Sequence, residues 1–373
     1  MYIDLPTDSG ARLMLTQLGF DLTPRAASVL VGSGLGLAFG LLAQRTRFCL
    51  RRAIAGPAGE RSVAAGVWAA ALAVALAGTT ALLSTGLVDL SGHRFFAERL
   101  PVLAVVLGGL LFGVGMVLAR GCASRLTVLA GTGNLRALTA MIVFVVVAHA
   151  ALKGALAPAR MAAGAVSIDL GAYSSLAALP GGSVVWASLA ILALAVFVLR
   201  SDARPVEIAG GALIGLLAPL GWLATGWLLK DDFDPVPVES LALTSAGAET
   251  LFWWVASSAI QPTFGVGFLA GVVLGSAVAA VVAREWKVAG FTEEVSTGRY
   301  LAGGALMGFG GVLAGGCTVG AGLSGVPTLS VAAIVAFLSI IAGGLLARAI
   351  LDGSGTRRVR LLDAASAGAL LIP

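Results

Sequence analysis

The sequence has few charged residues, and this scarcity excludes most classes of protein. Charged residues make up 12% of the 373 residues, whereas soluble domains carry about 25%. Hydrophobic residues make up 58% and the mean hydropathy is +0.98, which leaves too little polar surface to face water on all sides. The net charge of +5 is spread over short segments between apolar runs, and without a concentrated basic face nucleic-acid binding is not expected. The composition predicts an integral membrane protein.

Cysteine and histidine are also scarce. The three cysteines form no C-x-x-C pair, and an odd number does not make a disulfide framework. His93 and His149 are the only histidines, so a Cys/His metal site has almost no ligands to draw on. We therefore expect no cofactor. The N-terminal segment MYIDLPTDSGARLML is acidic and polar and lacks the basic start of a cleaved signal peptide.

Apolar runs long enough to cross a bilayer are abundant. A span needs about 20 residues to cross about 30 Å of hydrocarbon. We predict nine spans, at residues 26–44, 62–84, 101–119, 134–156, 183–199, 206–230, 263–283, 299–315 and 328–347. The sequence thus predicts an all-α membrane protein of about nine transmembrane helices embedded in a lipid bilayer.

Arginine marks alternate connecting segments, which predicts the topology. The basic segments are 45–61, 120–136, 200–205 and the tail after 350, whereas the others are acidic or mixed. By the positive-inside rule the basic segments face the cytoplasm. With an odd number of spans, the N-terminus is then periplasmic and the C-terminus cytoplasmic. We expect residues 1–25 to form an extracytoplasmic segment, 26–350 a single transmembrane domain and 351–373 a cytoplasmic tail.

An internal repeat carries two of the cysteines. A shift of 195 residues lays GGLLFGVGMVLARGCASR over GGALMGFGGVLAGGCTVG, so that Cys122 matches Cys317 and Gly121 matches Gly316. In the predicted topology the first copy ends inside and the second outside, with repeat halves of roughly 26–156 and 206–347. Inverted repeats of this kind are typical of transporters, in which the substrate site lies at the repeat interface.

The segments that follow these two cysteines are too short to span. We expect CASRLTVLAGTG (122–133) and CTVGAGLSGVP (317–327) to form re-entrant half-helices, because irregular backbone at membrane depth must line a cavity or be buried in protein. Their N-termini would offer free N–H groups and partial positive charge to an anion at mid-membrane. The third cysteine, Cys49, lies among arginines in RTRFCLRR at the end of the first span.

A packing role for the cysteines is the competing interpretation. Free cysteine is often buried as a small hydrophobe, and glycines around it commonly serve close helix packing. Against this, all three cysteines lie beside Gly or Arg at the ends of spans, and two occupy equivalent places in the repeat. A functional role is therefore favoured.

Two further signals are weaker. His149 and Lys153 share one face of the fourth span near its outer end, where they either line a basic vestibule or, for Lys153, extend to the interface. No Asp or Glu falls well inside a predicted span, which argues against a carboxylate proton relay of the usual pump type.

Three cysteine motifs together resemble the YeeE/YedE family of bacterial inner-membrane proteins. They are RTRFCLRRA, VLARGCASRLTVLAGTGNLRAL and GGVLAGGCTVGAGLSG, and the resemblance covers about residues 26–350. It implies an hourglass-shaped protein that takes up thiosulfate and is not an enzyme, with a separate TusA-like sulfur-carrier protein as cytoplasmic partner. Matched motif by motif, it implies a substrate path lined by Cys49, Cys122 and Cys317. We expect their neighbours in the motifs to belong to the same path: Gly121, Arg120, Ser124, Arg125, Gly316, Thr318 and Arg47.

The chemistry of thiosulfate fits these residues. Helix N-termini and arginines can hold the oxygens of the dianion, and neutral thiols offer weak S–H donors to its terminal sulfur. Importing two negative charges against 100 mV costs about 4.6 kcal/mol, so proton or sodium symport, or consumption of thiosulfate inside, must offset that cost. Another sulfur or selenium compound, a membrane thiol redox protein and a purely structural subunit remain as alternatives.

Overall fold

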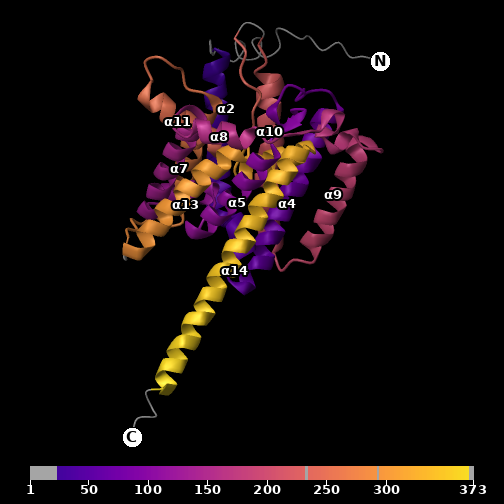
Figure 1. Ribbon diagram of the computed structural model, residues 1–373. Coiled ribbons are helices and arrows are strands. Elements are labelled where there is room, and N and C mark those ends of the chain that lie inside the picture. Colours follow the sequence, from indigo (N-terminus) through magenta and orange to yellow (C-terminus); the bar gives the residue numbers. More distant parts are fainter. Residues whose placement is uncertain (1–22, 232–233, 292–293, 369–373) are drawn as a thin grey trace.

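A bundle of long helices makes up nearly the whole of the described chain (Figure 1). The computed structural model describes residues 23–231, 234–291 and 294–368. Within that part of the chain the only strands are β1 (Arg99–Leu100) and β2 (Ile168–Asp169), which pair antiparallel. The expected N-terminal segment 1–25 lies almost wholly outside the described residues, and the limits of the expected domains stay a prediction.

Nine segments of the described chain are long and apolar enough to cross a membrane, which confirms the predicted spans. Their long helices are α2 (Pro24–Thr46), α4 (Ala58–Ser84), α5 (Val102–Leu118), α7 (Leu135–Lys153), α9 (Gly182–Leu199), α10 (Pro205–Leu223), α12 (Phe264–Val282), α13 (Glu294–Leu313) and α14 (Val331–Gly368). Shorter elements are α3 (Leu50–Ala55), α6 (Ala123–Gly131), α8 (Ala157–Gly164), α11 (Leu243–Val255), η1 (Arg94–Phe96), η2 (Gly171–Ser174), η3 (Leu176–Ala178), η4 (Ala224–Leu228), η5 (Thr318–Gly325) and η6 (Val326–Thr328).

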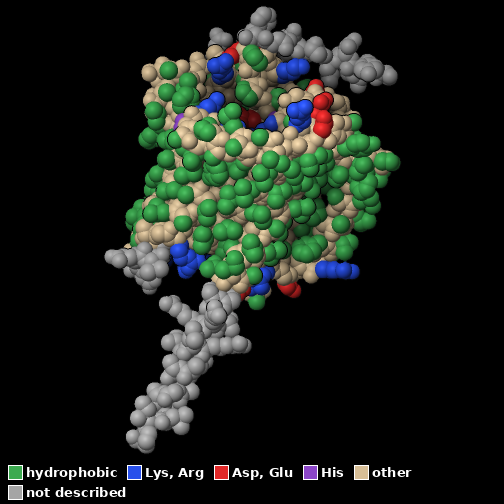
Figure 2. Space-filling view, viewed as in Figure 1, with side chains coloured by type: hydrophobic (Ala, Val, Ile, Leu, Met, Phe, Trp, Pro, Cys, Tyr) green, Lys and Arg blue, Asp and Glu red, His purple; other side chains and the backbone are tan. Residues whose placement is uncertain are grey.

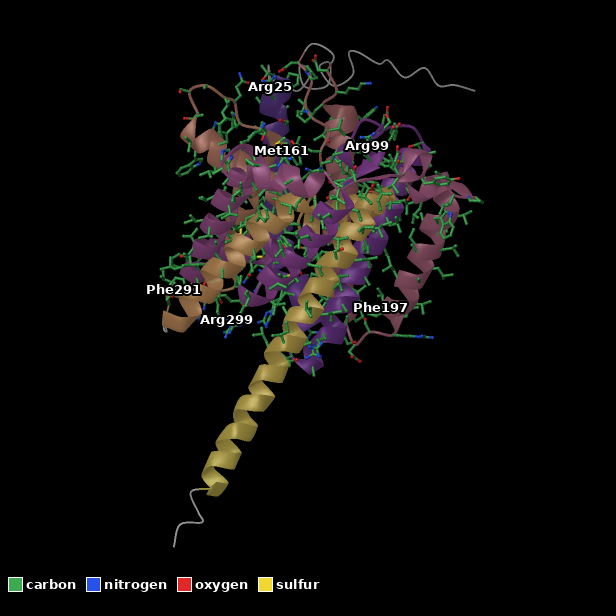
Figure 3. All side chains as sticks on the ribbon, viewed as in Figure 1. Arg25, Arg99, Met161, Phe197, Phe291 and Arg299 are labelled. Carbon is green, nitrogen blue, oxygen red and sulfur yellow. The ribbon has the colours of Figure 1, made fainter. Side chains whose placement is uncertain are left out.

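Polar side chains gather at the two ends of the bundle. Figure 3 places Arg25 and Arg99 at one end, which we call the upper face, and Phe291 and Arg299 at the other, the lower face. Between the faces a broad band of hydrophobic side chains covers the visible side of the molecule (Figure 2). An apolar band bounded by charged ends is the surface that a lipid bilayer requires, so the chain is a multi-pass membrane protein.

Glycines bring helices from the two halves of the chain into backbone contact. A Cβ atom on Gly36 of α2 would lie 2.2 Å from the Phe268 carbonyl oxygen of α12, and one on Gly271 of α12 would lie 2.2 Å from the Ser33 carbonyl oxygen. The pair formed by α4 and α10 shows the same close approach, since a Cβ on Gly215 would lie 2.1 Å from the Ala71 carbonyl oxygen. Only glycine fits at such contacts.

The crossing of α5 and α13 shows that the two halves are related by an approximate twofold axis. A Cβ on Gly108 would lie 2.7 Å from the Gly310 carbonyl oxygen, and one on Gly310 would lie 2.6 Å from that of Gly108. Gly115 and Gly303 oppose each other in the same way, at 2.6 and 2.7 Å. In the internal repeat Gly108 corresponds to Gly303 and Gly115 to Gly310, so the two contacts are equivalent. Equivalent contacts of this kind are the pattern of an isologous interface. The two helices run in opposite directions.

The two expected half-helices are present and begin deep in the bundle. α6 starts after Cys122 and η5, a short π-helix, starts after Cys317. Beyond α6 the chain reaches the lower face, where the Ala289 N–H donates to the Gly133 carbonyl at 3.1 Å. Beyond η5 it reaches the upper face, where the Ser330 hydroxyl donates to the Phe95 carbonyl at 2.6 Å. The half-helices therefore enter from opposite faces and point their N-termini inward.

Candidate functional site

All three cysteines occupy the same structural position, the residue just before a short helix. Cys49 is the N-cap of α3, Cys122 of α6 and Cys317 of η5. Their exposed fractions are 5%, 0% and 0%, and none is in a disulfide. Each side chain therefore lies beside free backbone N–H groups that begin a helix, in the interior of a membrane protein.

Cys49 and Cys122 form a thiol pair. Their Sγ atoms lie 3.8 Å apart, and the Cys122 Sγ lies 3.1 Å from the Ser124 hydroxyl. A thiol is both a weak donor and a weak acceptor, so the three groups form a small polar chain within an apolar interior. The sequence did not predict this pair, because it matched Cys122 only with Cys317.

Aromatic stacking holds the backbone that presents Cys49. The Phe48 ring stacks on Trp68 of α4 with 4.5 Å between centroids, and Trp68 in turn stacks on Phe337 of α14 at 5.9 Å. Arg47 ends α2 in the left-handed conformation with φ of 52°, which turns the chain inward. Buried aromatic pairs of this kind contribute about 0.5–1.5 kcal/mol beyond their area, so the position of Cys49 is well supported.

Cys317 caps the second half-helix and brings a buried hydroxyl close to the thiol pair. Its Sγ accepts a hydrogen bond from the Gly320 N–H at 3.4 Å, which caps η5. The next residue, Thr318, is fully buried, and the Cys122 thiol is the partner found near its hydroxyl among the described residues. Because a thiol is a weak hydrogen-bonding group, the hydroxyl is available to bond a passing polar ligand.

Arg125 links the thiol pair to the lower face. It follows Ser124 on α6, and its Nη1 donates to the Gln44 side-chain oxygen at 3.1 Å. The Gln44 amide nitrogen donates to the Glu285 carboxylate at 3.0 Å. This chain of hydrogen bonds holds a positive charge near the Cys49–Cys122 pair.

The other residues expected on the path divide between tight turns and the surface. Gly121 and Gly316 are buried at the turns before the two half-helices, and a Cβ on Gly316 would lie 2.7 Å from the Ala321 nitrogen. Arg47 and Arg120 are exposed, and both have positive φ angles. The two glycines thus permit the turns, while these two arginines lie outside the thiol cluster.

His149 and Lys153, the expected vestibule residues, lie near the upper end of α7. The His149 ring stacks on Phe252 at 5.4 Å, and Lys153 is exposed. Neither lines the cavity described next, and their role on the path stays a prediction.

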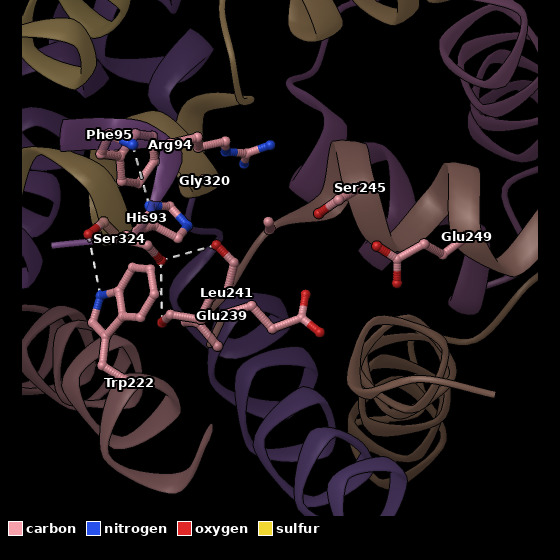
Figure 4. A pocket seen from close by; sticks show the side chains of 13 residues that line it. His93, Arg94, Phe95, Trp222, Glu239, Leu241, Ser245, Glu249, Gly320 and Ser324 are labelled. Carbon is pink, nitrogen blue, oxygen red and sulfur yellow. Dashed lines mark hydrogen bonds between the residues drawn. The ribbon is translucent and has the colours of Figure 1, made fainter. Parts of the chain in front are cut away.

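A cavity of about 250 Å³ opens above η5 (Figure 4). Its floor includes Gly320 and Ser324 of η5, the helix that Cys317 caps. The complete lining is Gly92, His93, Arg94, Phe95, Trp222, Glu239, Ser240, Leu241, Ala242, Ser245, Glu249, Gly320 and Ser324. The cavity therefore places polar and charged side chains beside the short helix that the third cysteine caps.

His93 is a neutral donor in this cavity. Burial first, and the charge of Arg94 second, lower its pKa to about 4. Its Nδ1 accepts a hydrogen bond from the Phe95 N–H at 3.3 Å, so the ring proton is on Nε2. The ring packs edge-on against Trp222, whose indole N–H donates to the Ser324 carbonyl at 3.3 Å. The arrangement fixes the tautomer and orientation of His93.

One cation and two carboxyl groups share the cavity. The Arg94 guanidinium lies over the Phe95 ring at 5.5 Å, and the nearby carboxyl groups of Glu239 and Glu249 interact with its charge. Burial raises the pKa of Glu239 to about 8, with Glu249 adding to the shift and Arg94 opposing it. Glu249 accepts a hydrogen bond from the Thr263 hydroxyl at 2.6 Å. These ionisable groups were missed from the sequence, where they appear only as charges in two separate loops.

Comparison with known proteins places the chain in a single family. The sequence profile of a family described as sulphur transport matches residues 45–346. The chain is 28% identical to the thiosulfate transporter TsuA of Escherichia coli (strain K12) over 326 residues, which is 79% of this chain and 86% of the relative. It is also 28% identical to the thiosulfate transporter TsuA of Spirochaeta thermophila over 327 residues, or 83% and 94% of the two chains.

Proposed function

This chain belongs to the sulphur transport family, as its resemblance to the YeeE/YedE proteins predicts, and from that premise we propose that it carries thiosulfate across a membrane through the centre of the bundle. The convergence of three thiols supports this path: Cys49 and Cys122 meet from one half of the chain, and Cys317 caps the opposing half-helix. The buried Thr318 hydroxyl beside Cys122 adds a further donor at the same place.

On this path the anion meets donors of decreasing charge toward the centre. It enters the cavity beside Arg94 and His93, passes the floor at η5 and reaches Cys317, then the Cys49–Cys122 pair and Arg125. Neutral thiols bind a soft sulfur weakly, and weak binding at several sites is what permeation requires. A thiolate would repel a dianion, so the thiols act in their protonated form.

We assign the lower face to the cytoplasm of a bacterial inner membrane. The arginine-rich segments 45–61, 120–136 and 200–205 connect helices at that face, and positive charge is retained on the cytoplasmic side. The cavity then opens to the periplasm. A separate TusA-like sulfur-carrier protein at the lower face would consume the imported sulfur and so offset the electrical cost of uptake.

Uptake in living cells tests the proposal. A bacterium stripped of its own sulfate and thiosulfate importers would express the chain with thiosulfate as sole sulfur source. We expect growth with the wild type and with the control Ser28→Ala, a buried hydroxyl on α2, and no growth with Cys122→Ala or Cys317→Ala. Growth of all four strains would indicate that the thiols serve packing and are not needed for transport. If the wild type does not grow, thiosulfate is not its substrate, and selenium or other sulfur compounds would be tested next.

A dithiol redox protein is the second candidate, because the 3.8 Å between Cys49 and Cys122 meets its first requirement. Net electron transfer from a reduced thiol donor would support it, whereas uptake without electron transfer supports the transporter.

A further inference from the structure

The upper cavity has the wrong charge for an anion pathway when all of its carboxyl groups are ionised. Arg94 is its one cation, His93 is neutral there, and Glu239 and Glu249 are both among the lining residues. Two carboxylates against one guanidinium leave a net negative charge. The excess negative charge repels a dianion that enters such a space.

The charged groups face one another across the opening. Figure 4 shows the Arg94 guanidinium, the Ser245 hydroxyl and the two carboxyl groups directed into the same space from different segments of the chain. Arg94 comes from η1, Glu249 from α11 and Glu239 from the loop between η4 and α11. His93, Arg94 and Glu249 are the ionisable groups that share the lining with Glu239.

The two carboxyl groups differ in their hydrogen bonds. Glu249 accepts a hydrogen bond from the Thr263 hydroxyl at 2.6 Å. The Glu239 backbone is held on both sides by Thr225, whose hydroxyl accepts from the Glu239 N–H at 3.0 Å and donates to its carbonyl at 2.6 Å. No hydrogen bond to the Glu239 carboxyl group is found among the described residues, and the group is half-buried at the cavity wall.

We propose that Glu239 is a proton-binding site whose occupancy is linked to binding of a divalent anion in the upper cavity. One proton from the upper solution binds the Glu239 carboxylate for each anion that occupies the cavity, and no other bond is made or broken. The inference rests on the proposed function for the identity of the anion, but its chemistry needs only a small oxyanion with two negative charges.

Protonation has two effects on the anion. Protonation removes the excess negative charge, so that the charge of Arg94 balances that of the remaining carboxylate. It also converts a repelling carboxylate into an O–H donor that can bond an anion oxygen. Because linkage is reciprocal, the anion raises the proton affinity of Glu239 by the same factor by which the proton raises the affinity for the anion. The pKa of about 8 that burial and Glu249 give Glu239 places this exchange within reach of ordinary external pH.

Proton uptake by the purified full-length protein tests the linkage directly. In weak buffer at about pH 9, where Glu239 is mostly ionised before the anion is added, the protein would be mixed with sodium thiosulfate and, separately, with sodium sulfate. We expect the wild type to take up close to one proton per chain with thiosulfate. Glu239→Gln should take up none, whereas the matched control Glu98→Gln, an exposed carboxyl group that does not line the cavity, should retain the uptake. Equal proton uptake by Glu239→Gln and wild type, or none by the wild type with either anion, would overturn the proposal.

Transport in liposomes separates this inference from the proposed function. Below about pH 8 the protonated form dominates, so wild-type uptake should be high at low pH and fall as the pH rises through that value. Glu239→Gln, which mimics the neutral acid, should transport with no such fall. A mutant curve identical to the wild-type curve would contradict the proposal. If the wild type carries no thiosulfate at any pH, the proposed function fails, and the proton measurement with sulfate decides the linkage on its own.

Discussion

The Sγ atoms of Cys49 and Cys122 lie 3.8 Å apart, although 73 positions separate the two residues in the chain. The contact joins the end of the first span to the start of the first half-helix, so it can form only when α2, α4 and α5 are all in place. It also puts two oxidisable thiols side by side on the proposed path.

Oxidation of these two thiols should therefore block transport. A membrane-permeant dithiol oxidant is expected to join Cys49 to Cys122 and to abolish uptake, and a reductant should restore it, because a disulfide removes both thiols from the path. Alkylation after unfolding should count three free thiols before oxidation and only Cys317 afterwards. Cys49→Ser should resist the oxidant. Full inhibition of Cys49→Ser by the oxidant would contradict this account.

Removing the Thr318 hydroxyl should weaken transport without weakening the fold. Among the described residues only the weakly bonding Cys122 thiol lies near this hydroxyl, so Thr318→Val should leave thermal stability nearly unchanged. If the group serves the anion, uptake should fall about 3- to 10-fold, the value of one ordinary hydrogen bond. Thr79→Val on α4 removes a buried hydroxyl without a partner among the described residues and should leave uptake unchanged. Equal effects of the two substitutions would place Thr318 off the path.

Neutralising Arg94 should weaken capture of the anion. Arg94 is the only Arg or Lys among the described residues that line the upper cavity, and a charge-assisted hydrogen bond contributes about 1.5–3 kcal/mol. We expect Arg94→Gln to raise the KM for thiosulfate at least about 10-fold, and Arg94→Lys to retain part of the affinity. Arg99→Gln, an exposed arginine at the same face, is the control. A KM that depends on Arg99 as strongly as on Arg94 would indicate general surface attraction instead of a site.

Two neighbouring glycines of α2 should respond in opposite ways to alanine. A Cβ on Gly36 would meet the Phe268 carbonyl oxygen at 2.2 Å, whereas one on Gly34 would meet nothing within 4 Å. Gly36→Ala should lower the melting temperature, because overpacking costs about 1–3 kcal/mol. Gly34→Ala should raise it, by up to about 1 kcal/mol of helix propensity. Melting curves in detergent measure both, and similar shifts would argue against the close contact of α2 with α12.

Hydropathy predicted the spans well because each apolar run is bounded by charge or proline. The expected span 206–230, for example, corresponds to the observed Pro205–Leu228. The half-helices could also be predicted, since the glycines before Cys122 and Cys317 repeat and the segments after them are too short to span. In both cases the information is local, within a window of about 20 residues.

The cavity could not be predicted in this way. Arg94 and Glu239 lie in loops that hydropathy assigns only to the outside of the membrane, and they converge through contacts between distant segments. The Ser330 hydroxyl draws the Phe95 backbone inward at 2.6 Å, across 235 positions of sequence. Cys49 was missed as the partner of Cys122 for the same reason. Neither periodicity nor composition encodes contacts at such separations.

The fifth of the nine spans in the described chain, α9, sets the orientation of the second half by making the number of crossings odd. The first half of the chain contributes α2, α4, α5 and α7, an even set that returns the chain to the side where it began, and the second half contributes α10, α12, α13 and α14. α9 stands between the two sets and buries only Ala187. One additional crossing is what reverses the second set, so that η5 enters from the face opposite α6. A helix that buries little of its own surface thus determines how the two halves are oriented relative to each other. Without it, both half-helices would reach the same face of the membrane.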